Sequence, residues 1–305
     1  MKKSTEEFLK MFGKGKEALG KMAEGYIYLK WINLYIYHIR NVVPDPEVTL
    51  RYPEEVATPE ADELAKMAAE QAFPTLASAE TSTYHSNVVK LDDAKSLVTV
   101  KQEISLTNLE TIVPFKHARD IILKNPDHIA VIDCSCRSTK ENPCKPIDVC
   151  IAVGEPYASF ALEHKVNNAR KISQEEAVEI IEAEDDRGHI HTAWFKEAMG
   201  GRFYAICNCC KCCCAAMRGF RWGVPIIAPS GYVSEIGEDC NGCGQCIDFC
   251  QFEALTLKDE RAEVIYDKCM GCGVCETKCP IDAISLKRDP AKGNPLDIKA
   301  LMKQA

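Results

Sequence analysis

Cysteine is absent from the first 133 residues of the chain, although its 305 residues include 18 cysteines. A long apolar run is also missing, because the most apolar stretch, residues 26–43, is interrupted by Lys30 and Arg40. A helix that spans a bilayer needs about 20 predominantly apolar residues, so this stretch is not expected to cross a membrane. All the cysteines lie between Cys134 and Cys279. Thiols at this density point to disulfides, zinc or iron–sulfur clusters.

Basic residues are in deficit, since 37 Lys and Arg stand against 45 Asp and Glu, a net charge of -8. A protein that binds nucleic acid regardless of its sequence needs a basic surplus to neutralise phosphates, so no nucleic-acid partner is expected. Residues 1–7 are followed by no apolar run typical of a secretory signal. We therefore expect a cytoplasmic protein, with a peripheral position at the inner face of the membrane left open. Disulfides are disfavoured in that compartment, so the cysteines are expected to bind metal.

Apolar residues recur at three- and four-residue steps over residues 4–41, which predicts one long amphipathic helix. Lysines such as Lys10 and Lys14 flank the apolar stripe, and tyrosines cluster toward its end. Three roles stay open for this helix: contact with a membrane surface, contact with a partner subunit or second copy, and packing in the core of its own domain.

The region that follows mixes helical and extended patterns. Residues 115–124 predict a helix that ends before Pro126. Residues 128–133 are apolar and β-branched, and they predict a buried strand that leads to Cys134. Ser173 begins a capping box and predicts a helix that ends near Gly188. The pattern is therefore mixed α/β.

A Cys-x2-Cys-x2-Cys-x3-Cys pattern occurs twice near the C-terminus. Its cysteines are Cys240, Cys243, Cys246 and Cys250, then Cys269, Cys272, Cys275 and Cys279. Zinc sites prefer two separated pairs of ligands, so this spacing favours iron–sulfur clusters. The whole segment resembles a bacterial-type two-cluster ferredoxin, in which the fourth cysteine of each run binds the other cluster.

The resemblance implies two [4Fe–4S] clusters with crossed ligands. The first would take Cys240, Cys243, Cys246 and Cys279. The second would take Cys269, Cys272, Cys275 and Cys250. Gln251 stands where a proline usually follows the fourth cysteine, which puts the local geometry and the potential of the second cluster in doubt but not its ligands.

Ten cysteines lie upstream of this repeat. They are Cys134, Cys136, Cys144, Cys150, Cys207, Cys209, Cys210, Cys212, Cys213 and Cys214. This region contains C-x-C-R, P-x-x-V-C and C-N-C-C-x-C-C-C segments, and a G-x-x-H-T segment that ends at Thr192. Together with the repeat, these segments resemble a family of four-iron–four-sulfur proteins found in anaerobes. The likeness covers residues 111–286 and implies redox function in anaerobic metabolism, without naming a substrate.

The ten upstream cysteines are candidate ligands of one or two further iron–sulfur clusters. At four thiolates per cubane they suffice for two clusters with two thiols to spare, or for one cluster with spectators. Adjacent cysteines point in different directions, so the cysteines of residues 134–150 are expected to meet part of the run 207–214. His191 is a candidate replacement for one thiolate, with a position on the surface or a supporting position beside the ligands as the alternative. Arg137 and Lys211 are candidates to offset cluster charge, unless they are solvated.

The predicted fold class is α+β. Its parts are a helical N-terminal region (1–84), a cysteine-rich iron–sulfur domain (85–232), a ferredoxin-like two-cluster domain (233–290) and a C-terminal tail (291–305).

The favoured function is electron transfer, with low-potential electrons passing through the two [4Fe–4S] clusters to or from a cluster in the middle domain. No dinucleotide or phosphate-binding motif accompanies the cysteines. We expect a metal-binding electron-transport component of an anaerobic oxidoreductase system, with redox partner proteins. Two alternatives remain: an oxidoreductase whose middle-domain cluster reduces a substrate, and a cluster carrier or redox sensor.

Overall fold

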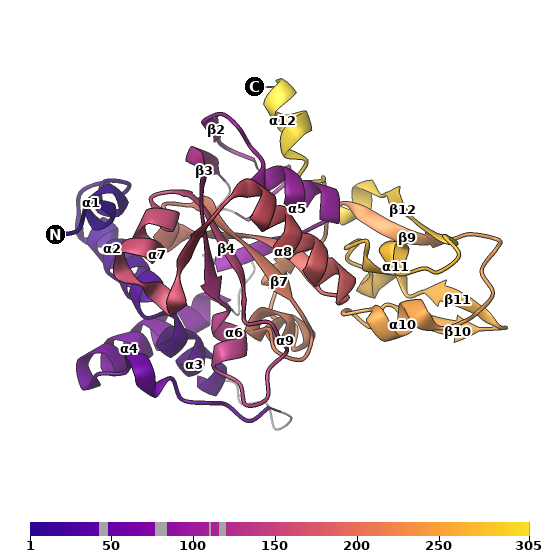
Figure 1. Ribbon diagram of the computed structural model, residues 1–305, viewed down its shortest axis with the longest axis horizontal. Helices are drawn as coiled ribbons and strands as arrows, with labels where there is room; N and C mark the ends of the chain where they lie inside the picture. The colour runs from indigo at the N-terminus through magenta and orange to yellow at the C-terminus, as the bar shows by residue number, and fades with distance from the viewer. Residues whose placement is uncertain (43–47, 77–83, 110, 116–119, 305) are drawn as a thin grey trace.

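The computed structural model describes residues 1–42, 48–76, 84–109, 111–115 and 120–304 (Figure 1). Short 3-10 helices occur at Glu54–Val56, Val166–Asn168, Glu197–Met199, Tyr266–Lys268 and Pro290–Lys292. In the described part of the chain, no helix is both long and apolar enough to cross a membrane.

The N-terminal region begins with three helices: α1 (Lys3–Leu9), α2 (Lys16–Lys30) and α3 (Ile32–Val42). The prediction of one helix over residues 4–41 is therefore wrong. Gly15 has a φ of +123°, which side-chain-bearing residues rarely adopt, so the backbone turns between α1 and α2. A second break falls at Trp31, whose φ and ψ are -125° and 44°. A fourth helix, α4 (Pro59–Leu76), packs against α3.

These helices form part of the molecule's own core. Phe8, Tyr28 and Tyr35 are almost completely buried, and they belong to one apolar cluster with Trp194 and Tyr204 of the central sheet. The hydroxyl groups of Tyr28 and Tyr204 lie 2.9 Å apart, so each phenol keeps a hydrogen-bond partner. Of the three roles left open for this region, the structure thus shows packing within the chain.

The central sheet runs in the order β2-β3-β4-β7-β6-β1-β8, and β5 pairs with β3. Its strands are β1 (Tyr84–Val89), β2 (Ile104–Leu106), β3 (Ile121–Asp133), β4 (Asp148–Glu155), β5 (Arg170–Ile172), β6 (Ile190–Lys196), β7 (Arg202–Cys209) and β8 (Ile227–Ala228). The pairs are antiparallel except for β1 with β8. An antiparallel sheet with helices packed on it is an α+β fold, which confirms the predicted class.

The predicted strand 128–133 is the second half of β3. The predicted helix 115–124 is wrong where it can be compared, because residues 121–124 pair with β2 or β4, while residues 116–119 lie outside the described residues. The predicted helix after Ser173 is confirmed as α8 (Gln174–Asp186), and the Ser173 hydroxyl accepts a hydrogen bond from the Glu176 backbone N–H at 3.1 Å.

Helices cover both faces of the sheet. The N-terminal helices, α7 (Tyr157–His164) and α9 (Ala215–Arg221) share an apolar core with one face. The other face packs against α5 (Leu91–Val98), α8 and α12 (Ile298–Gln304). Leu296 and Ile298 are buried in this second core, so the C-terminal segment packs on the sheet domain. Successive residues of a strand point to opposite faces, so alternate residues of each central strand enter one core or the other.

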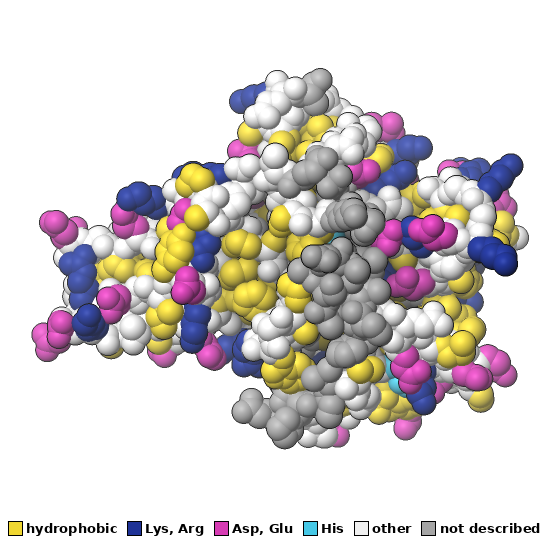
Figure 2. Space-filling model, turned by 180° about the vertical axis from the view of Figure 1, so that it is seen from behind, with side chains coloured by type: hydrophobic (Ala, Val, Ile, Leu, Met, Phe, Trp, Pro, Cys, Tyr) yellow, Lys and Arg dark blue, Asp and Glu magenta, His cyan; other side chains and the backbone are white. Residues whose placement is uncertain are grey.

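The C-terminal module lies at one end of the molecule (Figure 1). It consists of β9 (Tyr232–Ile236), α10 (Gln245–Phe249), β10 (Leu255–Lys258), β11 (Arg261–Val264), α11 (Val274–Thr277) and β12 (Ile284–Arg288). Strand β9 pairs with β12 and β10 pairs with β11, while α10 packs against α11. Side chains of both charges are interspersed over the module, at the left of Figure 2. This arrangement is ferredoxin-like, as the repeat predicts.

Candidate metal centres

One small cavity of the C-terminal module is lined by the four thiols that the sequence groups for a first cluster. These are Cys240, Cys243, Cys246 and Cys279, which come from both halves of the repeat. Backbone hydrogen bonds from Ala262 and Gly242 lower the pKa of Cys240. The cavity thus offers converging thiols and backbone donors, the surroundings that favour thiolate ligands.

The thiols grouped for a second cluster lie deeper. Burial, followed by the nearby thiols of Cys275 and Cys250, raises the pKa of Cys272 well above its ordinary value. Burial also raises the pKa of Cys275 to about 12, although a hydrogen bond with Ser234 opposes the shift. The Ser234 hydroxyl lies 3.1 Å from the Cys275 Sγ and 3.7 Å from the Cys269 Sγ.

Two features repeat between the halves of the module and suit it to hold clusters. Cys250 Sγ accepts a hydrogen bond from the Ala254 backbone N–H at 3.2 Å, and Cys279 Sγ accepts one from the Ala283 backbone N–H at the same distance. Gly242 and Gly271 have φ values of +68° and +64°, and a Cβ on either would collide with a carbonyl oxygen, that of Glu260 or of Tyr232. The close approach of two backbone segments at these positions therefore requires glycine.

The ten upstream thiols separate into two sets. We call the first the six-thiol ring; its members are Cys134, Cys136, Cys150, Cys207, Cys209 and Cys214. We call the second the four-thiol site; its members are Cys144, Cys210, Cys212 and Cys213. Each set combines cysteines from residues 134–150 with cysteines from the run 207–214, so the two sequence groups meet in space. None of the 18 cysteines, all of which are described, forms a disulfide.

The ring is a sequence of neighbouring thiols. Cys134 interacts with Cys136 and Cys150, Cys150 with Cys207, and Cys136 with Cys214. Cys214 and Cys209 lie 3.3 Å apart. Hydrogen bonds with Cys136 and Cys150, with burial, raise the pKa of Cys134, whereas hydrogen bonds from Cys134 and Cys214 lower that of Cys136. The thiols of the ring thus lie close enough to interact directly with one another.

The strands explain why these six thiols converge. Cys207 and Cys209 are two residues apart on β7, so both point to the same face of the sheet, as does Ala205. Cys150 lies on the adjacent strand β4. Cys134 directly follows the next strand, β3, and precedes α6 (Ser135–Ser138), while Cys214 precedes α9. Three neighbouring strands and two helix starts thus deliver thiols to one place.

The ring borders an elongated cavity of about 160 Å³ on the face covered by the N-terminal helices. Most of the remaining lining is apolar, and its aromatic members are Tyr28, Tyr35, Tyr157, Phe160, Trp194, Tyr204 and Trp222. Arg40 also lines the cavity and is 4% exposed. Its Nη1 donates to the Cys136 carbonyl and to Thr139, whereas its Nε and Nη2 have no hydrogen-bond partner among the described residues.

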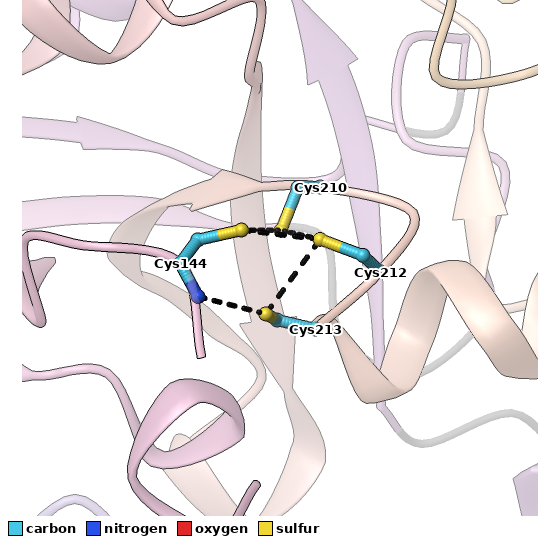
Figure 3. A group of neighbouring side chains, drawn as sticks. All are labelled: Cys144, Cys210, Cys212 and Cys213. Carbon is cyan, nitrogen blue, oxygen red and sulfur yellow. Dashed lines mark hydrogen bonds between the residues drawn. The ribbon is translucent and has the colours of Figure 1, made fainter. Parts of the chain in front are cut away.

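The four-thiol site is more compact (Figure 3). Cys212 Sγ lies 3.1 Å from Cys144 Sγ, 3.4 Å from Cys210 Sγ and 3.7 Å from Cys213 Sγ. Cys144 comes from the loop before β4, and the other three come from the loop between β7 and α9. Burial is the main cause that raises the pKa of Cys144 to about 12. Hydrogen bonds from Cys210 and Cys212 lower the pKa of Cys213.

A buried ion pair lies beside both sets. Arg137 and Glu184 are each 1% exposed at the side chain, and Arg137 Nη2 lies 2.5 Å from Glu184 Oε2. His189 Nδ1 lies 2.7 Å from the same oxygen. Burial opposes the charge of Arg137, but its interactions with Glu184 and its proximity to Cys134 and Cys210 raise its pKa. The guanidinium therefore keeps a positive charge near both sets of thiols.

The other charged candidates occupy different positions. His191 Nδ1 lies 2.7 Å from Asn208 Oδ1, and its Nε2 lies 3.7 Å from Asp185 Oδ1, so both nitrogens face oxygen atoms. This arrangement favours the supporting role for His191. Lys211 Nζ lies 3.5 Å from Glu253 Oε1 on the partly exposed surface of the C-terminal module.

Gln251 joins the module to the cysteine-rich domain. Its Oε1 accepts a hydrogen bond from the Lys211 backbone N–H at 2.9 Å, and its Nε2 donates to the Gly188 carbonyl at 2.7 Å. Lys278 forms a nearby ion pair with Asp186 at 2.9 Å. The residue that departs from the ferredoxin pattern thus links Cys250 to the loop that carries the four-thiol site.

Sequence reasoning missed three features of these centres: the cavity, Arg40 and the Glu184–His189 pair. The sequence contains one indication that Arg40 has a special role, because this charged residue interrupts the otherwise apolar stretch of residues 26–43. Nothing in the sequence around Glu184 distinguishes it from the solvated acidic residues of the same helix.

Residues 239–283 match the family described as the 4Fe-4S dicluster domain. No curated protein matches the chain. The C-terminal module accordingly carries two [4Fe–4S] clusters, and the chain contains an iron–sulfur electron-transfer module with a further cysteine-rich region that could bind metal.

Proposed function

We propose that the protein transfers low-potential electrons between a redox partner and an iron–sulfur cluster on the six-thiol ring, through the two clusters of the C-terminal module. The ring itself carries the proposal. It gathers six thiols in the lining of one cavity, beside buried arginines and in the same core as part of the module. Iron–sulfur clusters supply one-electron chemistry, and thiolates with nearby cations are the ligands that hold them.

The positions of the thiols support an order for the path. Cys243 is exposed, and Cys240, Cys246 and Cys279 pack in a small apolar cluster of the module that also includes Cys250 and Cys275. Cys269 and Cys272 instead pack in the main core that also contains Cys209 and Cys214. The first group of four ligands thus suits exchange with a partner protein, and the second suits exchange with the ring.

An aromatic contact lies between the second group and the ring. Phe252 follows Cys250 by two residues, and its ring centroid lies 5.8 Å from that of Phe220. Phe220 belongs to α9, which begins directly after Cys214. Packed side chains therefore connect the segment after Cys250 to the helix that begins directly after Cys214.

The proposal predicts the iron content of anaerobically purified protein. Two [4Fe–4S] clusters account for eight irons, and the ring should add to that number. In Cys209→Ser/Cys214→Ser, the excess should disappear while the EPR signals of the module remain. Cys243→Ser is the matched control, because it should alter the module and spare the excess iron. An iron content of eight or fewer after full reconstitution would remove the ring cluster from the proposal.

The rate at which the ring cluster is reduced tests the proposed path of the electrons, from the module to the ring. A low-potential donor should reduce the ring cluster rapidly in the intact protein and slowly in the Cys243→Ser variant, since electrons would then lack their entry point. Equal rates in both proteins would contradict the path.

The cavity favours a second candidate, an oxidoreductase that reduces a small substrate at the ring. An apolar cavity of about 150 Å³ suffices for a molecule of the size of benzene, and the cavity here is about 160 Å³. The free Nε and Nη2 of Arg40 would bind a carbonyl or carboxylate group on such a molecule. The substrate class is therefore a small apolar compound with one such acceptor.

Filling the cavity separates the two candidates. Ala205→Phe would place a phenyl group in the cavity, because Ala205 lines the cavity and lies on the same strand as Cys207. If the protein is a reductase, candidate aromatic carboxylates and carbonyl compounds should perturb the EPR signal of the ring cluster in the wild type but not in this variant. If no compound of this class perturbs the wild-type signal, the electron-transfer function stands alone.

A further inference from the structure

The four thiols of the four-thiol site are close enough to share a single metal ion. Their Sγ atoms all lie within 4.8 Å of one another, and the closest contacts between them span 3.1 to 4.0 Å. We infer that Cys144, Cys210, Cys212 and Cys213 bind one zinc ion in tetrahedral geometry. This site would be distinct from the clusters of the module and the ring.

The spacing of the sulfur atoms carries the inference. Zinc–thiolate bonds of about 2.3 Å place tetrahedral sulfur ligands about 3.8 Å apart. The observed spacing falls around this value. In a cubane, by contrast, each thiolate binds a different iron at a different corner, so the sulfur atoms stand farther apart. Among the described residues, which include every cysteine, neither group of module ligands gathers as closely as the four-thiol site.

The surroundings suit a closed site with a net negative charge. Four thiolates and Zn²⁺ carry a charge of about -2, after the four thiol protons leave to solvent on binding. Lys140 Nζ lies 4.0 Å from Cys213 Sγ, and the Cys144 backbone N–H donates to the same sulfur at 3.4 Å. Four protein ligands fill the tetrahedron, which is typical of a structural zinc site.

The ion would fasten two loops that are far apart in the sequence. Lys140 Nζ already joins them by a hydrogen bond to the Cys212 carbonyl at 2.9 Å. Lys211 lies between the ligands Cys210 and Cys212, and its backbone N–H contacts Gln251. Zinc would therefore hold the loop against which the C-terminal module docks. This role does not depend on the proposed path of the electrons.

Metal analysis of the full chain, expressed with iron and zinc both supplied and purified without oxygen, tests the inference. The wild type should contain one zinc per chain. Cys144→Ser and Cys212→Ser should each lose at least nine-tenths of the zinc and keep the wild-type iron content. Cys243→Ser, the matched control in the module, should lose iron and keep the zinc. Absence of zinc from the wild type, or loss of iron from the first two variants, would overturn the assignment.

A measurement on the unaltered protein covers the case in which these variants do not fold. X-ray absorption at the zinc edge should show four sulfur atoms at about 2.3 Å. A shell that contains nitrogen or oxygen ligands would show that zinc binds elsewhere on the protein, and it would overturn the proposal.

Discussion

Replacement of Gln251 by methionine should loosen the contact between the module and the cysteine-rich domain without a large change in volume. Gln251 is 8% exposed, and the variant leaves the Lys211 backbone N–H and the Gly188 carbonyl without their partner. An unsatisfied buried group costs about 1–3 kcal/mol. Two such groups give a total of about 2–6 kcal/mol, which is large relative to the stability of an ordinary domain.

Hydrogen exchange measures how much of this loss of stability affects the loop that contains Lys211. A loss of about 1–3 kcal/mol in local stability corresponds to exchange that is about 5–150 times faster, so peptides that contain the Lys211 amide should exchange faster by this factor in anaerobic holoprotein. Gln251→Glu is the control, because its carboxylate can still accept the Lys211 hydrogen bond while it loses the donor to Gly188. Unchanged exchange at Lys211 in Gln251→Met would refute the assigned role.

Two pairs of substitutions test separate parts of the structure. Glu184→Gln removes the charge that pairs with buried Arg137 and should destabilise the protein by about 3–5 kcal/mol in denaturant unfolding. Glu182→Gln, on the same helix, breaks only a partly exposed pair with Lys95 and should cost less than about 1 kcal/mol; equal losses would contradict the burial argument. Gly242→Ala should lower the iron content because the new Cβ would collide with the Glu260 carbonyl oxygen. In Gly244→Ala the new Cβ would meet only Leu257, at an ordinary distance, so this variant should keep its iron. Its positive φ should still reduce the free energy of unfolding by about 1–2 kcal/mol. Iron loss in both glycine variants would show that backbone conformation, and not the collision, is responsible.

The ferredoxin-like module was predictable because most of its ligands are close in sequence. Three cysteines of each run are separated by two residues, and this spacing is local. The partition of the ten upstream cysteines was not predictable in the same way. It depends on the adjacency of β4 and β7, which are more than 40 residues apart in the chain. Only the two-residue step from Cys207 to Cys209 held a clue, because on a strand it puts both thiols on one face.

The errors in secondary structure have a common cause. The apolar steps in residues 4–41 continue across Gly13 and Gly15, so periodicity alone predicted one helix where the backbone turns. Residues 121–123 form a short apolar run, and periodicity does not distinguish a strand from a helix in such a run. These residues form a strand because they pair with β2, which lies elsewhere in the sequence.

The division of thiols between the ring and the four-thiol site bears on how electrons can travel. Zinc has no redox chemistry, so an ion bound by Cys212 and its neighbours cannot relay electrons from Cys250 to the ring. It can only set the distance between the module and the ring, by holding the loop that Gln251 contacts. Loss of the ion in Cys144→Ser should therefore slow reduction of the ring cluster and leave its EPR signal and midpoint potential unchanged. Loss of an EPR signal in that variant would instead make the four-thiol site a member of the electron path.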